Sequence, residues 1–173
     1  MKALLVLAVL PLILAAQPGP LPAAPPAGSP ATYILEHYSK REVLIPMRDG
    51  VKLFTAVYQP KDKAQAYPVM LLRTPYTVAP YGSENYRGSL GPASEKFMRE
   101  GFIFVYQDVR GKGKSEGTYM NVRPHNPDKR TPKDIDEASD TYDSIEWLVK
   151  NLPNNNGKFG MYGISYPGFY AAM

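Results

Sequence analysis

Residues 159–168 of this 173-residue chain have the sequence Phe159-Gly160-Met161-Tyr162-Gly163-Ile164-Ser165-Tyr166-Pro167-Gly168. The apolar start predicts a buried strand, and Pro167 fits the first turn of a following helix, where a missing backbone N–H costs no hydrogen bond. Gly163, Ser165 and Gly168 follow a G-x-S-x-x-G pattern, with the second glycine one residue later than in the G-x-S-x-G motif of a nucleophile elbow. Such a turn exposes the serine hydroxyl and directs the next backbone N–H groups at a developing negative charge. Ser165 is therefore a candidate nucleophile, with an ordinary strand-turn-helix junction as the alternative.

The chain before this motif contains a predicted β-hairpin and two predicted buried strands. Side chains alternate in polarity before and after Asp49-Gly50, a dipeptide typical of two-residue type I′ turns. The positions expected on one face of the hairpin are Val43, Ile45, Met47, Val51, Leu53, Thr55 and Val57. Residues 69–72 and 102–106 are continuous apolar runs, which are typical of strands buried on both faces of a parallel sheet.

Two helices are predicted between these strands, over 92–100 and from Asp134 to Leu152. In the longer helix we expect the core to be contacted by Ile135, Ala138, Tyr142, Ile145, Leu148, Val149 and Leu152. Its acidic residues are expected on a solvated face, namely Asp134, Asp136, Glu137, Asp140 and Asp143. The order of elements, a hairpin followed by β-α-β-α-β, predicts an α/β fold with a parallel sheet flanked by helices.

The N-terminus has the pattern of a secretory signal peptide over residues 1–16. Lys2 precedes an apolar stretch from Leu4 to Leu14, and Ala15-Ala16 supplies small residues for cleavage before Gln17. The apolar stretch is shorter than the ~20 residues that span a bilayer, so no stable membrane anchor is expected. Residues 17–39 form a predicted Pro-rich linker and 40–173 the folded part. We expect an exported protein, periplasmic or extracellular.

The composition excludes several classes of protein. The chain contains no cysteine, so it is no disulfide scaffold and has neither a thiolate metal site nor a cysteine nucleophile. Its net charge of +4 is small and dispersed, which argues against a nucleic-acid partner. No metal or organic cofactor is implied.

The glycine-rich loop from Gly111 to Gly117 is a candidate phosphate-binding loop. A Walker sequence needs glycine where Asp108 stands, and the dinucleotide pattern needs its third glycine where Glu116 stands. We therefore assign the loop a structural role, with Asp108 and Arg110 as an expected local ion pair. A nucleotide-binding protein is kept as a minor alternative.

Four motifs together resemble the group of α/β-hydrolases that comprises cocaine esterases, α-amino-acid ester hydrolases and X-prolyl dipeptidyl peptidases. They are the elbow at 163–168, Met47-Arg48-Asp49-Gly50-Val51-Lys52-Leu53, Arg73-Thr74-Pro75-Tyr76, and the stretch from Asp108-Val109-Arg110-Gly111 to Gly117. The resemblance runs from about residue 40 to the end. It implies the N-terminal part of an α/β-hydrolase fold.

The resemblance also implies roles for three residues. Ser165 would be the nucleophile, Tyr166 would contribute its backbone N–H to the oxyanion hole, and the hydroxyl of Tyr76 would be the second oxyanion donor. The implied reaction is hydrolysis of an ester or amide through an acyl-enzyme. Substrates would be small esters or amides or short peptides, X-Pro peptides and α-amino acyl esters among them.

A serine hydrolase also needs a base and an acid, which follow the serine in the order Asp or Glu, then His. Neither occurs in the eight residues after Ser165, and both histidines, His37 and His125, precede it. We expect the two partners to lie beyond residue 173 and the chain to be an inactive N-terminal piece. His125, in a Pro-rich loop, is a remote alternative base, and His37 is expected to be exposed. A non-catalytic secreted binding protein on a truncated hydrolase scaffold remains the alternative function.

Overall fold

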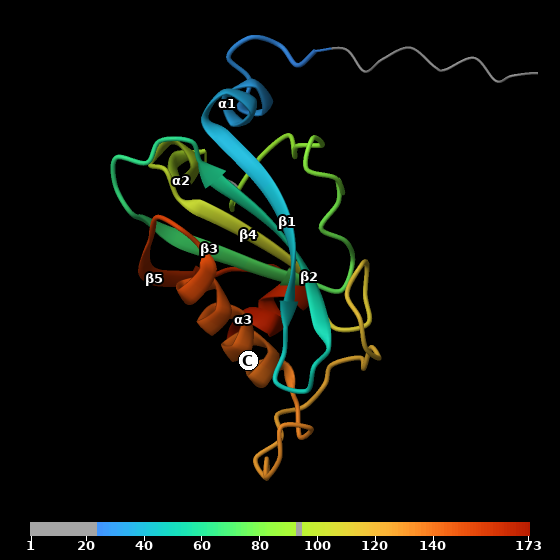
Figure 1. Ribbon diagram of the computed structural model, residues 1–173. Helices are drawn as coiled ribbons and strands as arrows, with labels where there is room; N and C mark the ends of the chain where they lie inside the picture. Colours follow the sequence, from blue (N-terminus) through green and yellow to red (C-terminus); the bar gives the residue numbers. More distant parts are fainter. Residues whose placement is uncertain (1–23, 93–94) are drawn as a thin grey trace, which may run out of the picture.

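The computed structural model describes residues 24–92 and 95–173 (Figure 1). This part of the chain forms five strands and four helices. In order they are α1 (Pro30–His37), β1 (Tyr38–Pro46), β2 (Lys52–Pro60), β3 (Tyr67–Thr74), α2 (Lys96–Arg99), β4 (Ile103–Asp108), α3 (Glu137–Asn151), β5 (Asn155–Met161) and α4 (Tyr166–Ala172). The signal peptide expected at 1–16 and residues 17–23 of the expected linker lie outside the described residues.

The strands form one sheet in the order β1-β2-β4-β3-β5. The hairpin strands β1 and β2 are antiparallel, β2 is antiparallel to β4, and β4, β3 and β5 are parallel to one another. Figure 1 shows the sheet with α3 packed across it. The predicted α/β arrangement is confirmed, and it places the carboxyl ends of β3, β4 and β5 at one edge.

Apolar side chains cover both faces of the sheet. On one face Leu53, Val57 and Leu71 pack with Leu148 and Leu152 of α3. On the other face Ile34 of α1 and Met98 of α2 lie in a second cluster built on β2 and β4. Burial on two faces explains the continuous apolar runs in these strands.

The hairpin turn differs from the prediction. Met47 N–H donates to the carbonyl of Val51, Gly50 N–H donates to the carbonyl of Met47, and only Gly50 (φ 89°) adopts a positive φ. The turn is therefore a three-residue loop with a glycine bulge, not a two-residue type I′ turn, which would need positive φ at Asp49 as well. The Asp49 carboxylate accepts from Val51 N–H and from Arg110, which holds this residue in its turn.

The helix expected over 92–100 is shorter, since α2 spans Lys96–Arg99 and ends at Gly101 (φ 83°). Helix α3 begins at Glu137, with Asp136 and Ser139 forming a reciprocal capping box. Residues 30–37, assigned to the linker, are helical instead. Ile34 in α1 is fully buried, so the packed region begins before residue 40.

Two expectations about α3 are wrong. Tyr142 and Val149 are exposed, whereas Asp136, Glu137 and Asp140 are buried. The N-terminal half of the helix presents a polar face to the sheet because Arg73 and Arg110 lie opposite Glu137 and Asp140. Asp136 pairs with Lys129 instead. Charged side chains can be buried when they are paired with counter-charges, and that condition is met here.

Candidate active site

The turn between β5 and α4 has the geometry of a nucleophile elbow. Ser165 adopts φ 59° and ψ −124°, a conformation that L-residues rarely occupy, and its side chain is exposed. A Cβ on Gly163 would lie 2.2 Å from the carbonyl carbon and oxygen of Pro167, so only glycine fits there. A Cβ on Gly168 would lie 3.2 Å from the carbonyl oxygen of Gly163. The second glycine, one residue late in sequence, therefore still faces the first across the turn.

Ser165 stands at the N-terminus of α4. Phe169 N–H donates to the Ser165 carbonyl, so the helix starts directly after the serine. The first N–H groups of a helix have no acceptor within it. The backbone N–H of Tyr166 lies among these groups, which is the position its expected role requires.

The Tyr166 side chain connects the elbow to the loop at 119–122. Its hydroxyl accepts hydrogen bonds from Val122 N–H and from the Tyr119 hydroxyl (3.0 Å), and it donates to Asn121 Oδ1 (2.9 Å). The bond to Tyr166 raises the pKa of Tyr119 to about 12. Burial opposes ionisation of Tyr166, but the donors from Tyr119 and Val122 outweigh it and lower the pKa of this phenol.

Tyr76 follows β3, the neighbour of β5 in the sheet. Its ring is 66% exposed, and its backbone N–H donates to Thr74 Oγ1 (3.2 Å). Because β3 and β5 are parallel and adjacent, Tyr76 and Ser165 both follow carboxyl ends at the same sheet edge. The structure thus brings the three residues singled out in the sequence to one edge, and their catalytic roles stay predictions.

A buried network of charged side chains lies near the carboxyl ends of β3 and β4. Arg110 donates to both carboxylate oxygens of Asp140 (Nε to Oδ2 3.0 Å, Nη2 to Oδ1 2.7 Å) and to Asp49 (2.7 Å). Burial acts to lower the pKa of Arg110, but these carboxylates outweigh it and raise the pKa. The expected ion pair between Asp108 and Arg110 is wrong. Arg110 pairs instead with Asp140 of α3 and with Asp49 of the hairpin turn.

Arg73 continues the network to α3 and α4. It is fully buried at the end of β3, donates to Glu137 and Thr141, and lies with its guanidinium carbon 5.6 Å from the centre of the Tyr170 ring. Burial raises the pKa of Glu137. Sequence reasoning missed this cluster. The available signal was the spacing of Glu137, Asp140 and Ser144 on one helix face, together with arginines inside two of the quoted motifs.

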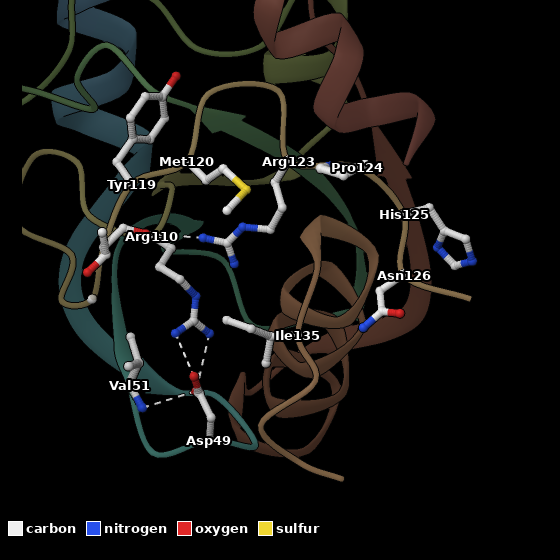
Figure 2. A pocket seen from close by; sticks show the side chains of 12 residues that line it. Asp49, Val51, Arg110, Tyr119, Met120, Arg123, Pro124, His125, Asn126 and Ile135 are labelled. Atoms are coloured by element: carbon white, nitrogen blue, oxygen red, sulfur yellow. Dashed lines mark hydrogen bonds and ion pairs between the residues drawn. The ribbon is translucent and has the colours of Figure 1, made fainter. Parts of the chain in front are cut away.

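A cavity of about 680 Å³ lies between the hairpin turn and the loop after β4 (Figure 2). Its lining residues are Asp49, Val51, Arg110, Gly117, Thr118, Tyr119, Met120, Arg123, Pro124, His125, Asn126 and Ile135. Neither Ser165 nor Tyr76 lines it. Tyr119 is one of these lining residues, and its hydroxyl donates to the Tyr166 hydroxyl, so Tyr119 connects the cavity wall to the elbow.

The structure does not bring either histidine to the serine. His125 lines the cavity with its Nδ1 3.0 Å from Oδ2 of the buried Asp136, and His37 is exposed at the end of α1. Across the described ranges, no group of three or more His, Asp and Glu residues is arranged to hold a metal ion. Within the same ranges no helix has both the length and the apolar character needed to cross a membrane.

Comparison with known proteins gives concordant matches. A family model described as X-Pro dipeptidyl-peptidase (S15 family) matches residues 49–173. Cocaine esterase from Rhodococcus sp. (strain MB1 Bresler) is 33% identical over 129 residues, which cover 73% of this chain and 19% of that protein.

Two solved structures share the fold at higher identity. A selenomethionine-labelled α-amino acid ester hydrolase is 43% identical with a TM-score of 0.66, covering 88% of this chain and 24% of that one. An aminopeptidase from the marine sediment archaeon Thaumarchaeota archaeon is 38% identical with a TM-score of 0.66, covering 91% of this chain and 25% of that one. The chain therefore spans about a quarter or less of these relatives' lengths. With the family model matched over most of its residues, the chain belongs to the X-Pro dipeptidyl-peptidase (S15) family and has the fold of the N-terminal part of an α/β-hydrolase.

Proposed function

We propose that this chain carries the nucleophile and the oxyanion donors of a serine hydrolase that cleaves esters or amides. One observation carries the proposal: Ser165 is exposed in a strained conformation (φ 59°) at a strand-to-helix turn where Gly163 admits no side chain. Backbone strain of this kind costs about 1–3 kcal/mol and persists where function requires it. An incidental serine in a relaxed junction would not need it.

The proposed reaction passes through an acyl-enzyme. Ser165 Oγ attacks the substrate carbonyl carbon, and the hydroxyl proton passes through a base to the departing alcohol or amine as its bond to the carbonyl carbon breaks. Water then cleaves the acyl ester and restores the hydroxyl. The base and its acid follow the serine in the chain order of α/β-hydrolases, so the proposal places them after residue 173.

The negative charge on the carbonyl oxygen would be stabilised by two donors. The Tyr166 backbone N–H lies in the first turn of α4, next to the nucleophile. The Tyr76 hydroxyl comes from the loop after the adjacent strand β3. Each such donor is typically worth ~10²–10³ in kcat.

The relatives suggest the substrate class. Their names refer to an esterase, an ester hydrolase of α-amino acids, an aminopeptidase and an X-Pro dipeptidyl-peptidase. All of these reactions attack an acyl carbon that bears an alcohol or amine leaving group. We infer a small ester or amide, or a short peptide, as the substrate of this protein.

The test is covalent labelling of the protein expressed from its whole coding sequence with a fluorophosphonate probe. The wild type and a Ser89→Ala control, which removes another exposed serine, should be labelled to the same extent. Ser165→Ala should abolish labelling while thermal unfolding stays within a few degrees of wild type. Labelling that persists in Ser165→Ala would refute the assignment.

We also propose that the protein is exported, on the basis of Lys2, the apolar stretch to Leu14 and Ala15-Ala16. Expression in a bacterial host should yield a mature protein that begins at Gln17 in the periplasm or medium, as measured by intact mass. An unprocessed N-terminus in the cytoplasmic fraction would contradict export.

A further inference from the structure

We propose that Asp108 is a positioning residue for Tyr76, holding the loop that presents this hydroxyl to the proposed oxyanion site. The inference rests on the proposed function and extends it to a residue outside the reacting groups. It also assigns the glycine-rich loop at 111–117 the role of covering the Asp108 carboxylate, in place of nucleotide binding or an ion pair with Arg110.

The placement follows from the sheet. Thr74, the last residue of β3, is in register with Asp108, the last residue of β4. Val109 N–H donates to the Thr74 carbonyl (3.0 Å), so the two strands stay paired to their ends. Because parallel strands end at the same edge, the loop leaving β3 passes the carboxylate that stands at the end of β4.

Three donors from two loops converge on this carboxylate. Val78 N–H donates to Oδ1 (3.0 Å), and the Tyr81 hydroxyl (2.9 Å) and Lys114 N–H (3.0 Å) donate to Oδ2. Asp108 is fully buried, and a carboxylate is an acceptor at both oxygens. A buried acceptor that satisfies three donors is costly to remove, because each donor is then left without a partner.

Tyr76 lies between two fixed points. On its N-terminal side, its own N–H donates to Thr74 Oγ1 (3.2 Å), and on its C-terminal side Val78 N–H is held by Asp108. The Tyr76 ring is largely exposed, so packing of the ring itself does not determine its position. The hydroxyl is placed through the backbone, and Asp108 is the partner that fixes the far side of the turn.

The glycine-rich loop closes over the same carboxylate. Gly113 (φ 53°) lies so close that a Cβ would be 2.0 Å from Asp108 Oδ2. Ser115 Oγ donates to the Asp108 carbonyl (2.6 Å) and accepts from Phe54 N–H (2.8 Å) of β2. The backbone of Asp108 is therefore linked through Ser115 to β2, and its carboxylate is covered by the glycine-rich loop, which leaves the residue little freedom to shift.

A double-mutant cycle on the protein expressed from its whole coding sequence tests the inference. A misplacement of about 1 Å costs on the order of 10²-fold in rate, so Asp108→Asn should lower kcat for a small chromogenic ester by about 10- to 100-fold, with KM within about threefold. In a Tyr76→Phe background, where the hydroxyl is already absent, Asp108→Asn should lower kcat by less than about threefold. An equal loss in both backgrounds would overturn the proposal, since Asp108 would then act on stability or on another group.

Two further variants keep the test decisive. Tyr81→Phe removes only one of the three donors and should reproduce a smaller part of the kcat loss if Asp108→Asn fails to fold. Glu42→Gln alters the same loop at Gly82 N–H (2.6 Å), which lies beyond Val78 and does not contact the Asp108 carboxylate, and should lower the melting temperature with kcat unchanged. If Ser165→Ala abolishes labelling but Tyr81→Phe and Asp108→Asn leave kcat intact, the positioning role fails and the proposed function stands. Labelling that survives Ser165→Ala refutes the proposed function itself.

Discussion

The hydroxyl of Tyr119 donates a 3.0 Å hydrogen bond to the hydroxyl of Tyr166, the residue after the candidate nucleophile. The two tyrosines are far apart in sequence, one in the loop after β4 and the other in the first turn of α4. Their contact joins the elbow to the wall of the 680 Å³ cavity. The backbone of Tyr166 is therefore fixed both by α4 and by the hydrogen bonds of the Tyr166 side chain.

Tyr166→Phe should weaken this connection without changing Gly163, Ser165 or Gly168 of the elbow. The variant removes the acceptor of Val122 N–H and the bonds to Tyr119 and Asn121, and each net hydrogen bond contributes about 0.5–1.5 kcal/mol. We expect a stability loss of about 1–3 kcal/mol by urea unfolding, with phosphonate labelling of Ser165 slowed severalfold. Tyr142→Phe, an exposed tyrosine on α3, should change neither quantity. Equal behaviour of the two variants would contradict the role given to the hydroxyl.

Gly163→Ala should disrupt the elbow. The new Cβ would meet the carbonyl of Pro167 at 2.2 Å, so the start of α4 must move away from the strand. We expect phosphonate labelling to slow by about 100-fold or more, since displacement of a reacting group by 1 Å has an effect of that order. Gly88→Ala, where a Cβ meets nothing within 4 Å, is the matched control. Normal labelling in Gly163→Ala would show that the turn is not constrained in this way.

Asp140→Asn should destabilise the fold strongly. It removes the charge that faces both Arg110 (2.7 Å) and Arg73 (3.9 Å), leaving Arg110 with Asp49 and Arg73 with Glu137 as the remaining carboxylate partners of two buried guanidinium groups. Breaking a buried pair from one side costs about 3–5 kcal/mol. Asp143, one turn along the same helix, pairs with the partly exposed Arg48. Asp143→Asn should therefore cost about 1 kcal/mol of stability or less. Chemical denaturation of both variants measures the difference, and similar losses would argue against the buried network.

Stability should depend on pH through Asp136. Burial alone would raise the pKa of Asp136, but Lys129 and the N–H groups of Asn126 and Ser139 outweigh it and lower the pKa. A carboxyl with a depressed folded-state pKa contributes its full stability above its unfolded pKa of about 3.9 and loses it as the pH falls through the folded value.

The corresponding measurement compares melting temperatures of wild type and Asp136→Asn from pH 7 to pH 2. The gap should be constant between pH 7 and about 5 and should shrink below about pH 4. Asp128→Asn, an exposed aspartate in the same loop, should show no such gap. A gap that widens on acidification would contradict the depressed pKa of Asp136.

The amino-acid sequence by itself determined the local features of this protein. The hairpin at Asp49-Gly50, the buried strands, the order of helices and strands and the elbow at 163–168 follow from patterns of period two and three to four and from glycine and proline placement. Ser165 was a candidate from the elbow pattern itself, whereas the roles of Tyr76 and Tyr166 were implied only by the resemblance of their motifs to a known group of hydrolases.

Only the tertiary structure decided which charges are buried and what they contact. Asp136, Glu137 and Asp140 have the spacing of a solvated helix face. Asp140 nevertheless pairs with Arg110 of the loop after β4, and Glu137 with Arg73 of β3, each 30 or more residues away in the sequence. In the same way, Asp108 binds the loop after β3 rather than its near neighbour Arg110. The physical reason is that the cost of burying a charge depends on the counter-charge and donors around it. Those partners are brought together by strand order and helix packing, which no local pattern along the chain encodes.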